Sequence, residues 1–442
     1  MPESPRPGRP RDPAGTPRGN QAAGSAAAKA PPGAAAASAP PDPSDLAALA
    51  AAVKAHALAL GFDLVGIADA APFADAEART LAWLARGGAA GMAWLTAERV
   101  RRACRPAELL PGARSFIAVA VGYRPAGEAR RGPTPPAPLP MREGGEDTPS
   151  PRPSPRGRGG EDRRSQPPAP PFPEREGGPG GLGHIARYAR GRDYHDVLKP
   201  RLWALVRFLE ARLGRPVAAR VFVDDGPCPD RAVAQRAGLG FFGKNTNLLT
   251  RTHGSYMLLG AALTDVPLPP DPPTVADCGA CTLCLDACPT GALPAPYVMD
   301  SGRCISYLTI EHRGPLPAAL RPLIGDHLFG CDVCQEVCPW NRLAPPSREP
   351  AFAPEVGAGA ALDPAALLAW DDAAYRERLR GSPLKRAKRQ GLRRNAALLL
   401  SHRRDAAAAV ALASARDDPD PVVAEQAAWS LARLPAPDEG GE

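Results

Sequence analysis

Apolar and polar residues follow regular periods through the first half of the chain, and these periods predict its folded elements. Residues 46–62, "LAALAAAVKAHALALGF", carry apolar residues at helical spacing, whereas "DLVGIA" (63–68) and "RSFIAVAVGY" (114–123) have the composition of buried strands. A long amphipathic helix is predicted within residues 184–214, and "AARVFVD" (218–224) predicts another strand. The helix has leucines near i, i+4, i+7 spacing: Leu198, Leu202, Leu205, Leu209 and Leu213. Because helix and strand signals alternate, we expect an α/β layer over residues 45–268.

Two stretches have no such period. Residues 1–44 are mostly Pro, Ala, Gly and Ser with scattered Arg, and residues 124–183 have Pro or Gly at almost every turn. Neither stretch offers a folded core anything periodic to bury. We therefore expect a disordered N-terminal tail (1–44) and a disordered insertion (124–183) inside the α/β domain.

The C-terminal region, 355–436, has a helical pattern with a weak internal repeat. "RNAAL" from Arg394 recurs as "EQAAW" from Glu425, 31 positions later. This period is close to that of helical repeats and predicts a short HEAT-like pair of hairpins, although a chance match between Ala-rich helices would look the same. Between 384 and 404 there are eight Lys or Arg and no acid. These include Lys385, Arg386, Lys388, Arg389, Arg393 and Arg394.

Composition restricts the possible classes of protein. With 442 residues, of which 44% are hydrophobic and 23% charged, the chain has material for two or three domains. No apolar run approaches the roughly 18 residues of a membrane-spanning helix, and the N-terminal "MPESPRPGRPRDPAG" has no apolar signal-peptide core. We expect a soluble, cytoplasmic protein, without membrane contact and without a symmetric interface, hence a monomer. The net charge of +7 permits a polyanionic partner.

Eight of the ten cysteines lie between Cys278 and Cys338, in the spacing of a metal site. "CGACTLCLDACPTGAL" (278–293) and "CDVCQEVCPW" (331–340) each contain Cys-x2-Cys followed by x3-Cys-Pro. Cysteines two residues apart bind one 4Fe-4S cluster, and the cysteine before proline reaches the neighbouring cluster. The pattern predicts a ferredoxin-like domain at 269–347 with two 4Fe-4S clusters. We assign Cys278, Cys281, Cys284 and Cys338 to the first cluster, and Cys288, Cys304, Cys331 and Cys334 to the second.

The assignment of the second cluster departs from the bacterial ferredoxin pattern, because 26 residues separate Cys304 from Cys331 where the pattern has two. A pair of structural zinc sites is the alternative, although zinc does not require the repeated x3-Cys-Pro exchange. Cys104 and Cys228 lack the spacing and are expected to be small buried apolar residues.

A second candidate site lies in "VFVDDGPCPDRAVAQRAGLGFFGKNTNLL" (221–249). Asp224 and Asp225 follow a strand and precede Gly226-Pro227, a position where α/β folds often place ligands. An Asp before Gly-Pro also caps turns, and this remains the alternative. "GLGFFGKN" lacks both the G-x-G-x-x-G and the Walker A spacing, so it does not predict a nucleotide site.

Taken together, "GFDLVGIA", "ARYARGRDYH", "VFVDDGP", "RAGLGFFGKNTNLL", "CGACTLCLDACPTGAL", "CISYLTIEHRG" and "GCDVCQEVCPWN" resemble the epoxyqueuosine reductase family, cobalamin-dependent iron-sulfur enzymes of tRNA queuosine synthesis. The resemblance covers about 45–435 apart from the insertion. It implies an α/β cobalamin-binding domain followed by a ferredoxin-like two-cluster domain and a C-terminal α-helical HEAT-like repeat. The implied reaction reduces epoxyqueuosine to queuosine at the wobble position of tRNA. Two electrons would pass from an external low-potential donor, of flavodoxin or ferredoxin type, through the clusters to cobalamin.

The resemblance also implies residue roles. The family's proton donor matches Asp224, while Asp225 stands where the family commonly has a small hydroxyl residue. A carboxylic acid that donates near neutral pH must be held protonated by burial or by neighbouring negative charge. The basic segment 384–404 would form a cradle for the anticodon arm; alternatively it is a solvated charged face. Residues matching blocks that line the cofactor and substrate region are Tyr194, His195, Lys244, Asn245, Thr246 and Ser306.

The Asp-x-His-x-x-Gly signature of other cobalamin proteins is absent, because Leu198 stands where the glycine belongs; the family holds its corrin without that signature. Three alternatives remain at the level of sequence. A reductive dehalogenase-like enzyme shares the cobalamin and two-cluster plan, but usually has a twin-arginine signal that this N-terminus lacks. A ferredoxin-type electron carrier would bind no cobalamin. A basic helical-repeat RNA-binding scaffold would bind tRNA without its clusters.

Overall fold

The first layer of the structure is a four-stranded antiparallel sheet. The computed structural model describes residues 42–127, 181–403 and 405–434. The sheet has the order β1 (Leu64–Asp69), β2 (Ser115–Gly122), β7 (Met257–Thr264) and β4 (Ala219–Phe222). All three neighbouring pairs are antiparallel. The predicted strands are therefore present, but the sheet is not the parallel one that alternating helices and strands usually produce, since burial periodicity carries no information on strand direction.

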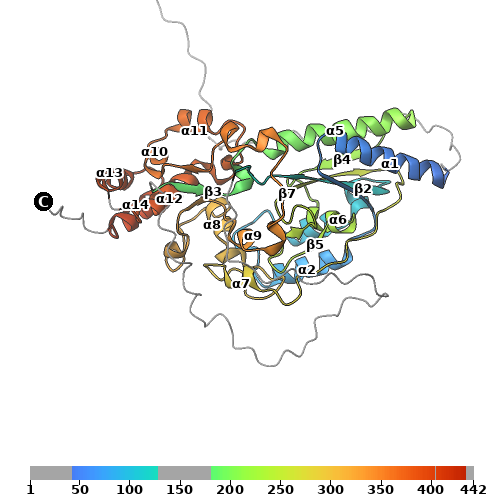
Figure 1. Cartoon of the computed structure of the whole chain (residues 1–442). Coiled ribbons are helices and arrows are strands. Elements are labelled where there is room, and N and C mark those ends of the chain that lie inside the picture. Colours follow the sequence, from blue (N-terminus) through green and yellow to red (C-terminus); the bar gives the residue numbers. More distant parts are fainter. Residues whose placement is uncertain (1–41, 128–180, 404, 435–442) are drawn as a thin grey trace, which may run out of the picture. The chain divides into compact units, whose positions relative to one another are not determined.

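Alternate residues of β2 point into two separate cores. Ile117, Val119 and Val121 pack on one side with the helices α1 (Pro43–Ala59) and α5 (Tyr194–Leu213). The intervening Phe116, Ala118 and Ala120 pack on the other side, against α6 (Asp230–Arg236). This is the period of two expected for a strand that is buried on both faces. Figure 1 shows α1 and α5 covering one face of the sheet and α6 lying below the other.

The long-helix prediction is confirmed in α5. Leu198, Leu202, Leu205 and Leu209 are fully buried, and Gly214 in the left-handed conformation follows the helix at its C-cap. Further elements of this half are α2 (Ala74–Ala85), α3 (Ala97–Ala103), α4 (Pro106–Leu109) and the hairpin of β5 (Phe241–Phe242) with β6 (Leu248–Leu249).

The cysteine-rich segment contains only short elements. These are α7 (Leu283–Asp286), α8 (Ile305–Ile310), α9 (Val333–Glu336) and β8 (His327–Phe329). The 3-10 turns of the chain are η1 (Arg187–Ala189), η2 (Ser301–Arg303), η3 (Arg321–Leu323), η4 (Pro339–Asn341), η5 (Pro350–Phe352), η6 (Pro354–Val356) and η7 (Pro383–Ala387).

A second sheet joins three distant segments. The strand β3 (Gly183–Ile185) pairs in parallel with β8 and antiparallel with β9 (Ala361–Leu362). Gly183 was expected to belong to the disordered insertion, and its place in β3 corrects that boundary. Arg124, at the other edge, donates to the carbonyl oxygen of Ala344. The expected tail also ended too late, because Pro43 and Ser44 lie in α1. Most of the expected tail and insertion, residues 1–41 and 128–180, lies outside the described residues.

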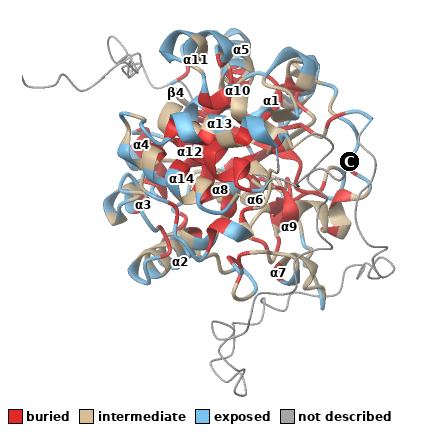
Figure 2. Ribbon diagram, turned by 90° about the vertical axis from the view of Figure 1, so that its left-hand side faces the viewer, coloured by how far each residue is buried: buried red, intermediate tan, exposed pale blue. Residues whose placement is uncertain are grey.

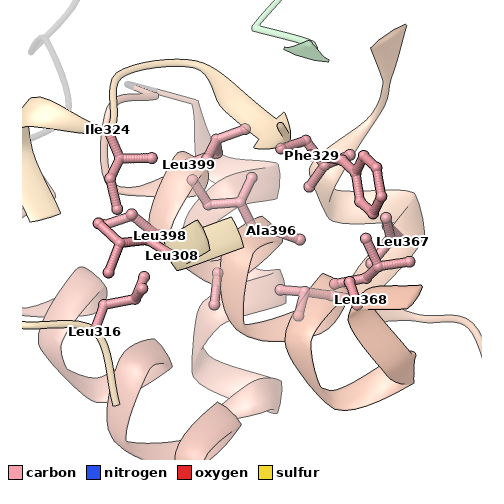
Figure 3. Close-up of a cluster of buried hydrophobic side chains, with 14 of the residues drawn as sticks. Leu308, Leu316, Ile324, Phe329, Leu367, Leu368, Ala396, Leu398 and Leu399 are labelled. Carbon is pink, nitrogen blue, oxygen red and sulfur yellow. The ribbon is translucent and has the colours of Figure 1, made fainter. Parts of the chain in front are cut away.

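The C-terminal helices share one hydrophobic core with the cysteine-rich segment. They are α10 (Pro364–Leu368), α11 (Asp372–Arg378), α12 (Lys388–Leu400), α13 (Ala406–Ala415) and α14 (Pro421–Leu431). Leu308 and Phe329 of the cysteine-rich segment lie in the same core as Leu367 and Leu398 (Figure 3). The cluster segment and the helical region are thus packed as one body, not as independent domains.

The sequence repeat falls on α12 and α14, which contact each other. Asn395 and Gln426, at equivalent positions of the repeat, are both buried, as are Ala396 and Ala427. Figure 2 shows how much of this helical core is buried. Among the residues described, no helix has both the length and the apolar character needed to cross a bilayer.

Candidate active site and cluster-binding segment

The structure brings the eight clustered cysteines into two groups. Electrostatic influence on the thiol of Cys338 comes from Cys278, Cys281 and Cys284, which lie 54 to 60 positions earlier in the chain. The thiol of Cys304 is influenced in the same way by Cys331 and Cys288.

The two groups adjoin each other. The thiol of Cys334 responds to Cys331, Cys304 and Cys288, and also to Cys284 of the other group. Both groups are explained if each Cys-x2-Cys run contributes its last cysteine, the one before proline, to the group of the other run. This arrangement brings the two groups close together.

Burial makes these thiols poor anions unless something positive binds them. It raises the pKa of Cys284 to about 11 and that of Cys338 to about 12. Metal ligation is the usual way in which buried thiols become thiolates. Within residues 42–127, 181–403 and 405–434, no three His, Cys, Asp or Glu side chains are placed to hold a single metal ion. A 4Fe-4S cluster does not require such a group, because each cysteine binds its own iron.

Lys244 and Asn245 brace the two cysteine loops. The ammonium of Lys244 donates to the carbonyl oxygens of Gly279 (2.6 Å) and Cys281 (2.9 Å). Asn245 is buried, and its amide donates to the carbonyl oxygen of Cys334 at 3.3 Å. Thr246 has a φ of 65°, and its backbone N–H donates to the carbonyl oxygen of Gly243, which closes a turn around Lys244 and Asn245.

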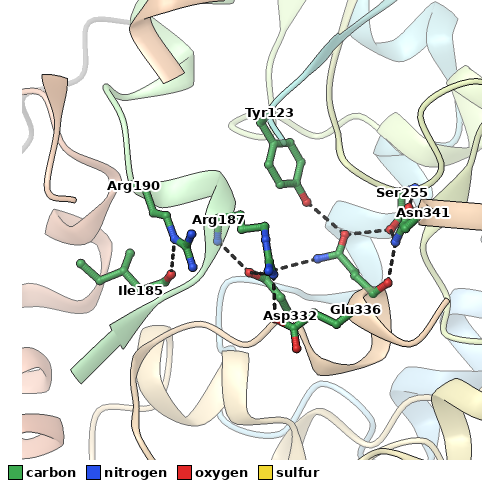
Figure 4. A network of polar contacts seen from close by, with 9 residues as sticks. Tyr123, Ile185, Arg187, Arg190, Ser255, Asp332, Glu336 and Asn341 are labelled. Carbon is green, nitrogen blue, oxygen red and sulfur yellow. Dashed lines mark hydrogen bonds and ion pairs between the residues drawn. The ribbon is translucent and has the colours of Figure 1, made fainter. Parts of the chain in front are cut away.

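A polar network fixes α9 against the first sheet (Figure 4). Arg187 donates from its backbone to Asp332 (2.7 Å) and from its guanidinium to Glu336 (2.8 Å). Tyr123, at the end of β2, donates to the side chain of Gln335 at 3.0 Å. Because α9 lies between Cys331 and Cys338, this network holds the second cysteine run at the end of the sheet.

The same network extends through Ser255 and Asn341. The hydroxyl of Ser255 lies 2.9 Å from the Oε1 of Gln335, and Asn341 donates to that hydroxyl at 2.9 Å. Beside it, the guanidinium of Arg190 donates to the carbonyl oxygen of Ile185. Buried networks of this kind fix one arrangement when their members are paired.

Asp224 lies on the turn directly after β4, as the sequence predicts, and its backbone is strained. Its φ of 53° is uncommon for a residue with a side chain. Its carboxylate is exposed and accepts a 2.7 Å hydrogen bond from the hydroxyl of Tyr194 on Oδ2. Burial, followed by the charge of Asp224, raises the pKa of Tyr194, so the phenol stays protonated and keeps donating.

Asp225 points elsewhere. Its carboxylate accepts from the backbone N–H of Val223 and pairs with Lys199. The two neighbouring acids therefore have different partners, which separates their roles.

A cavity of about 540 Å³ lies beside the Asp224 turn. Four segments form its wall: residues 80–104, the turn 224–230, the two residues Glu311 and Arg313 after α8, and Arg386 with Lys388. Lys388 has a positive φ of 61°. Like Asp224, it is one of the few described residues other than glycine with this conformation. Strained backbone gathers at functional sites, so two such residues in one cavity wall favour a functional role.

Cationic and aromatic groups stand at this cavity. Trp94 is 47% exposed, with the guanidinium carbons of Arg99 and Arg386 at 5.4 and 6.0 Å from its ring centroid. Arg386 also pairs with Glu311. Neither Trp94 nor Arg99 was a predicted site residue, because nothing in the local sequence links them to Asp224.

The basic residues predicted from 384–404 divide into two sets. Lys385, Arg386 and Lys388 are exposed, and the last two line the cavity. Arg389 donates to the carbonyl oxygen of Trp370 and Arg393 pairs with Asp418.

Arg394 is a structural residue. It is only 1% exposed, and its guanidinium donates to the carbonyl oxygens of Leu308, His312 and Gly314. It therefore has no free donor for a phosphate, and its prediction as a nucleic-acid contact was wrong. The error arose because charge counted along a sequence does not distinguish a cation that binds buried carbonyl groups.

The remaining predicted site residues lie around these regions. His195 stacks on Tyr194 and bonds to Asp193 at 2.7 Å, and Ser306 lies in α8, where its backbone N–H faces the thiol of Cys304. None of His195, Lys244, Asn245, Thr246 and Ser306 is among the described residues that line the cavity. Cys104 is buried as expected, whereas Cys228 is half-buried and lines the cavity.

Comparison with known proteins gives one family over most of the chain. A family model described as "4Fe-4S double cluster binding domain" matches residues 277–341, and one described as "Epoxyqueuosine reductase QueG, DUF1730" matches residues 166–225. An epoxyqueuosine reductase of Pseudomonas aeruginosa is 38% identical over 393 residues, covering 88% of this chain and 96% of its own. That of Escherichia coli is 34% identical over 392 residues, covering 89% and 91%.

Solved structures give the same result. A crystal structure of epoxyqueuosine reductase with an epoxyqueuosine-modified tRNA-Tyr stem loop has a TM-score of 0.71 and 32% identity, covering 88% of this chain and 91% of its own. An epoxyqueuosine reductase structure from Bacillus subtilis has a TM-score of 0.71 and 31% identity, covering 89% and 92%. In the latter, an aspartate catalytic loop is swung out of the active site.

Proposed function

This chain belongs to the epoxyqueuosine reductase family, and from that premise we propose that it reduces epoxyqueuosine to queuosine at the wobble position of tRNA. The observation that carries the proposal is the cavity in which the Asp224 turn meets exposed cations of the C-terminal region, in a molecule that also contains a double-cluster segment. A proton donor, a polyanion-binding rim and an electron path are the three parts that such a reduction needs.

The cysteines supply the electron path in this proposal. Cys278, Cys281, Cys284 and Cys338 bind one 4Fe-4S cluster, and Cys288, Cys304, Cys331 and Cys334 bind the other. Their mutual electrostatic influence supports this division. The electrostatic influence of Cys284 on the thiol of Cys334 indicates that the two sets are near each other, which favours electron transfer from one cluster to the next. An external low-potential protein of flavodoxin or ferredoxin type would supply the electrons.

Cobalamin is implied by the family, and the cavity wall fits a bulky bound group. The wall is partly apolar, and Oδ1 of Asp230 is buried in it without a hydrogen-bond partner among the described residues. The amide carbonyl groups of such a cofactor would accept a hydrogen bond from the protonated carboxyl group of Asp230. We propose that Pro227 and Pro229 of the turn after β4 and Val100 of α3, which line the cavity, hold it. When bound, cobalamin supplies a strongly reducing cobalt centre next to the substrate.

Asp224 supplies the proton that the departing epoxide oxygen needs. The Tyr194 hydroxyl holds Oδ2 in place, and its hydrogen bond stabilises the carboxylate left after the proton has gone. The catalytic aspartate loop described for the Bacillus subtilis relative supports a mobile acid at this turn. Asp225, paired with Lys199, holds the turn and does not donate.

The tRNA would approach over the exposed cations of the cavity rim. Lys385, Arg386 and Lys388 can neutralise phosphates, and Trp94 offers an exposed ring on which a base can stack. Arg389 and Arg393 orient the helix that carries this rim, since both already bind protein groups. The related structure with a modified tRNA stem loop supports RNA as the substrate.

The test is an anaerobic assay of cluster-reconstituted protein with cobalamin, a strong reductant and tRNA that carries epoxyqueuosine. The tRNA is digested and its nucleosides are read by mass spectrometry. We expect cobalamin-dependent loss of one oxygen from the modified nucleoside. Intact clusters without conversion and without bound cobalamin would instead indicate an electron carrier.

A further inference from the structure

Deoxygenation of an epoxide requires more protons than Asp224 holds. The inference drawn here rests on the proposed function. Two C–O bonds break, one C=C bond forms, and the oxygen leaves as water, which consumes two electrons and two protons. The external donor supplies the electrons through the clusters. One carboxylic acid supplies one proton, so a second proton must reach the same oxygen within each turnover.

Asp230 is a second acid in the wall of the same cavity. It lies six positions after Asp224, at the first residue of α6, and both residues line the cavity. Its Oδ1 is buried and has no hydrogen-bond partner in the described part of the chain. Burying an ionised carboxylate oxygen without a hydrogen-bond partner is unfavourable in free energy. A protonated carboxyl group avoids the charge and has an O–H to donate.

Helix stability alone could explain an acid at position 230, because a negative charge in the first turn of a helix is stabilised by the helix dipole. A hydrogen bond from the backbone N–H of Asp230 to its own carboxylate fits that explanation and, taken alone, lowers the pKa of Asp230. This bond does not account for Oδ1, which stays buried in the cavity wall without a partner among the described residues.

The surroundings of Asp230 favour its protonated form. Burial, and then the negative charge of Asp224, raise the pKa of Asp230 to about 7, with Asp225 adding to the rise and Arg231 opposing it. Burial, followed by the negative charge of Asp230 and a side-chain hydrogen bond with it, raises the pKa of the Cys228 thiol. The titratable and charged groups that other elements present to the cavity are Arg99, Cys104, Glu311, Arg313, Arg386 and Lys388.

We propose that Asp230 is a proton-reserve residue, which acts through Asp224 and supplies the second proton of each turnover. Asp224 gives its proton to the departing oxygen, Asp230 restores that proton directly or through a water in the cavity, and Asp224 donates again to release water. Both carboxylates then recover protons from solvent. The two acids would thus share work that neither performs alone.

The experiment measures kcat for queuosine formation between pH 5.5 and 9 in the cobalamin-loaded, cluster-containing protein, as wild type, Asp230→Asn, Asp230→Glu and Asp225→Asn. We expect wild-type kcat to fall as the pH rises through about 7. Asp230→Asn should lower kcat about 10-fold at pH 6.5. It should also abolish the fall of kcat near pH 7, which is the descending limb of the profile, because an amide does not titrate. Asp230→Glu should restore the descending limb, while Asp225→Asn should keep the descending limb of the wild type.

Cluster absorbance and tRNA affinity serve as readouts of folding, and both should be unchanged in Asp230→Asn. A wild-type profile without a limb between pH 6 and 8 would overturn the proposal even if the variant failed to fold. An Asp230→Asn variant with the kcat and the pH profile of the wild type would also overturn the proposal. That result would leave the proposed reductase function intact and remove only the role of Asp230 as proton reserve. Absence of queuosine in the wild type would reject the proposed function, and the proton reserve with it.

Discussion

The cluster-binding segment and the Asp224 cavity are encoded in different ways. All eight clustered cysteines lie between positions 278 and 338, and their spacing alone predicts two clusters. The cavity takes its wall from segments between Thr80 and Lys388, more than 300 positions apart. A cluster requires thiols at fixed local distances, whereas a substrate cavity requires a fold that brings unrelated loops together.

The two regions also differ in the origin of their pKa shifts. In the cluster segment, burial alone dominates each shifted thiol pKa, and bound metal would reverse its effect. In the cavity wall, the ion pair of Arg386 with Glu311 lies with two acids, and burial together with the negative charge of Asp224 raises the pKa of Asp230. Variants that affect one region and spare the other therefore test the division.

The largest effect is expected from loss of a cysteine of the second set. Cys334→Ser should abolish turnover and lower the iron content from about eight to about four atoms per chain, because one 4Fe-4S cluster is lost. Iron analysis and electron paramagnetic resonance of the reduced protein measure this. Cys104→Ala is the matched control and should keep all the iron, since Cys104 is buried in the other half of the molecule. Full iron in Cys334→Ser would refute its ligand role.

Removing the acid should separate the two regions most clearly. Asp224→Asn should keep both clusters and lower kcat by about 100-fold or more, the usual contribution of a general acid. Asp75→Asn is the control and should retain the activity, because Asp75 is an exposed acid in the first turn of α2 and is not among the described residues that line the cavity. Turnover at the wild-type rate in Asp224→Asn would remove the proton-donor assignment.

Changing the rim should weaken tRNA binding with an intact electron path. Replacing Lys385, Arg386 and Lys388 by Ala should reduce affinity about 10-fold or more at low salt, and should lower the salt dependence by about three phosphate contacts. Filter binding across a salt series measures both. Replacing three cations of α5, Arg201, Arg207 and Arg212, is the control and should have little effect. Equal losses in the two triple variants would show that only net charge matters.

A smaller loss is expected at the exposed ring. Trp94→Ala should weaken tRNA binding by about 1 kcal/mol if a base stacks on it, and Trp94→Phe should weaken it less. The two variants are compared with modified stem loop and with a poly-anion such as heparin. Equal weakening for both ligands would argue against stacking, because heparin has no bases.

The smallest effect concerns stability. The pKa of Asp230 is raised from 3.8 to about 7, so between these values the folded chain holds a proton that the unfolded chain releases. The free energy of unfolding should therefore fall as the pH rises through this window. Asp230→Asn should be more stable than wild type at pH 8 and gain little at pH 4. Thermal unfolding of both proteins at the two pH values measures this difference. An equal stability difference between Asp230→Asn and wild type at pH 4 and pH 8 would contradict the burial of a protonated Asp230.

Particular residues show how far sequence reasoning reaches. Local spacing predicted the cluster segment, the leucines of α5 and the Asp224 turn, because each depends on neighbours within a few turns of chain. Trp94, Arg99 and Asp230 were missed, since their importance comes from contacts with distant segments. Arg394 was misassigned for the same reason: its buried carbonyl partners lie about eighty positions away. Strand direction was also outside the reach of periodicity.

The most direct test of the account joins both regions in one measurement. Protein loaded with cobalamin and fully reduced is mixed anaerobically with epoxyqueuosine tRNA, without further reductant, and cluster absorbance and queuosine are followed in the same samples. The account predicts that the clusters of the wild type lose about two electrons for each queuosine formed. In Asp224→Asn, cluster oxidation and queuosine formation should both be slower by about 100-fold or more. Queuosine from clusters that stay reduced, or cluster oxidation at the wild-type rate in Asp224→Asn, would contradict it.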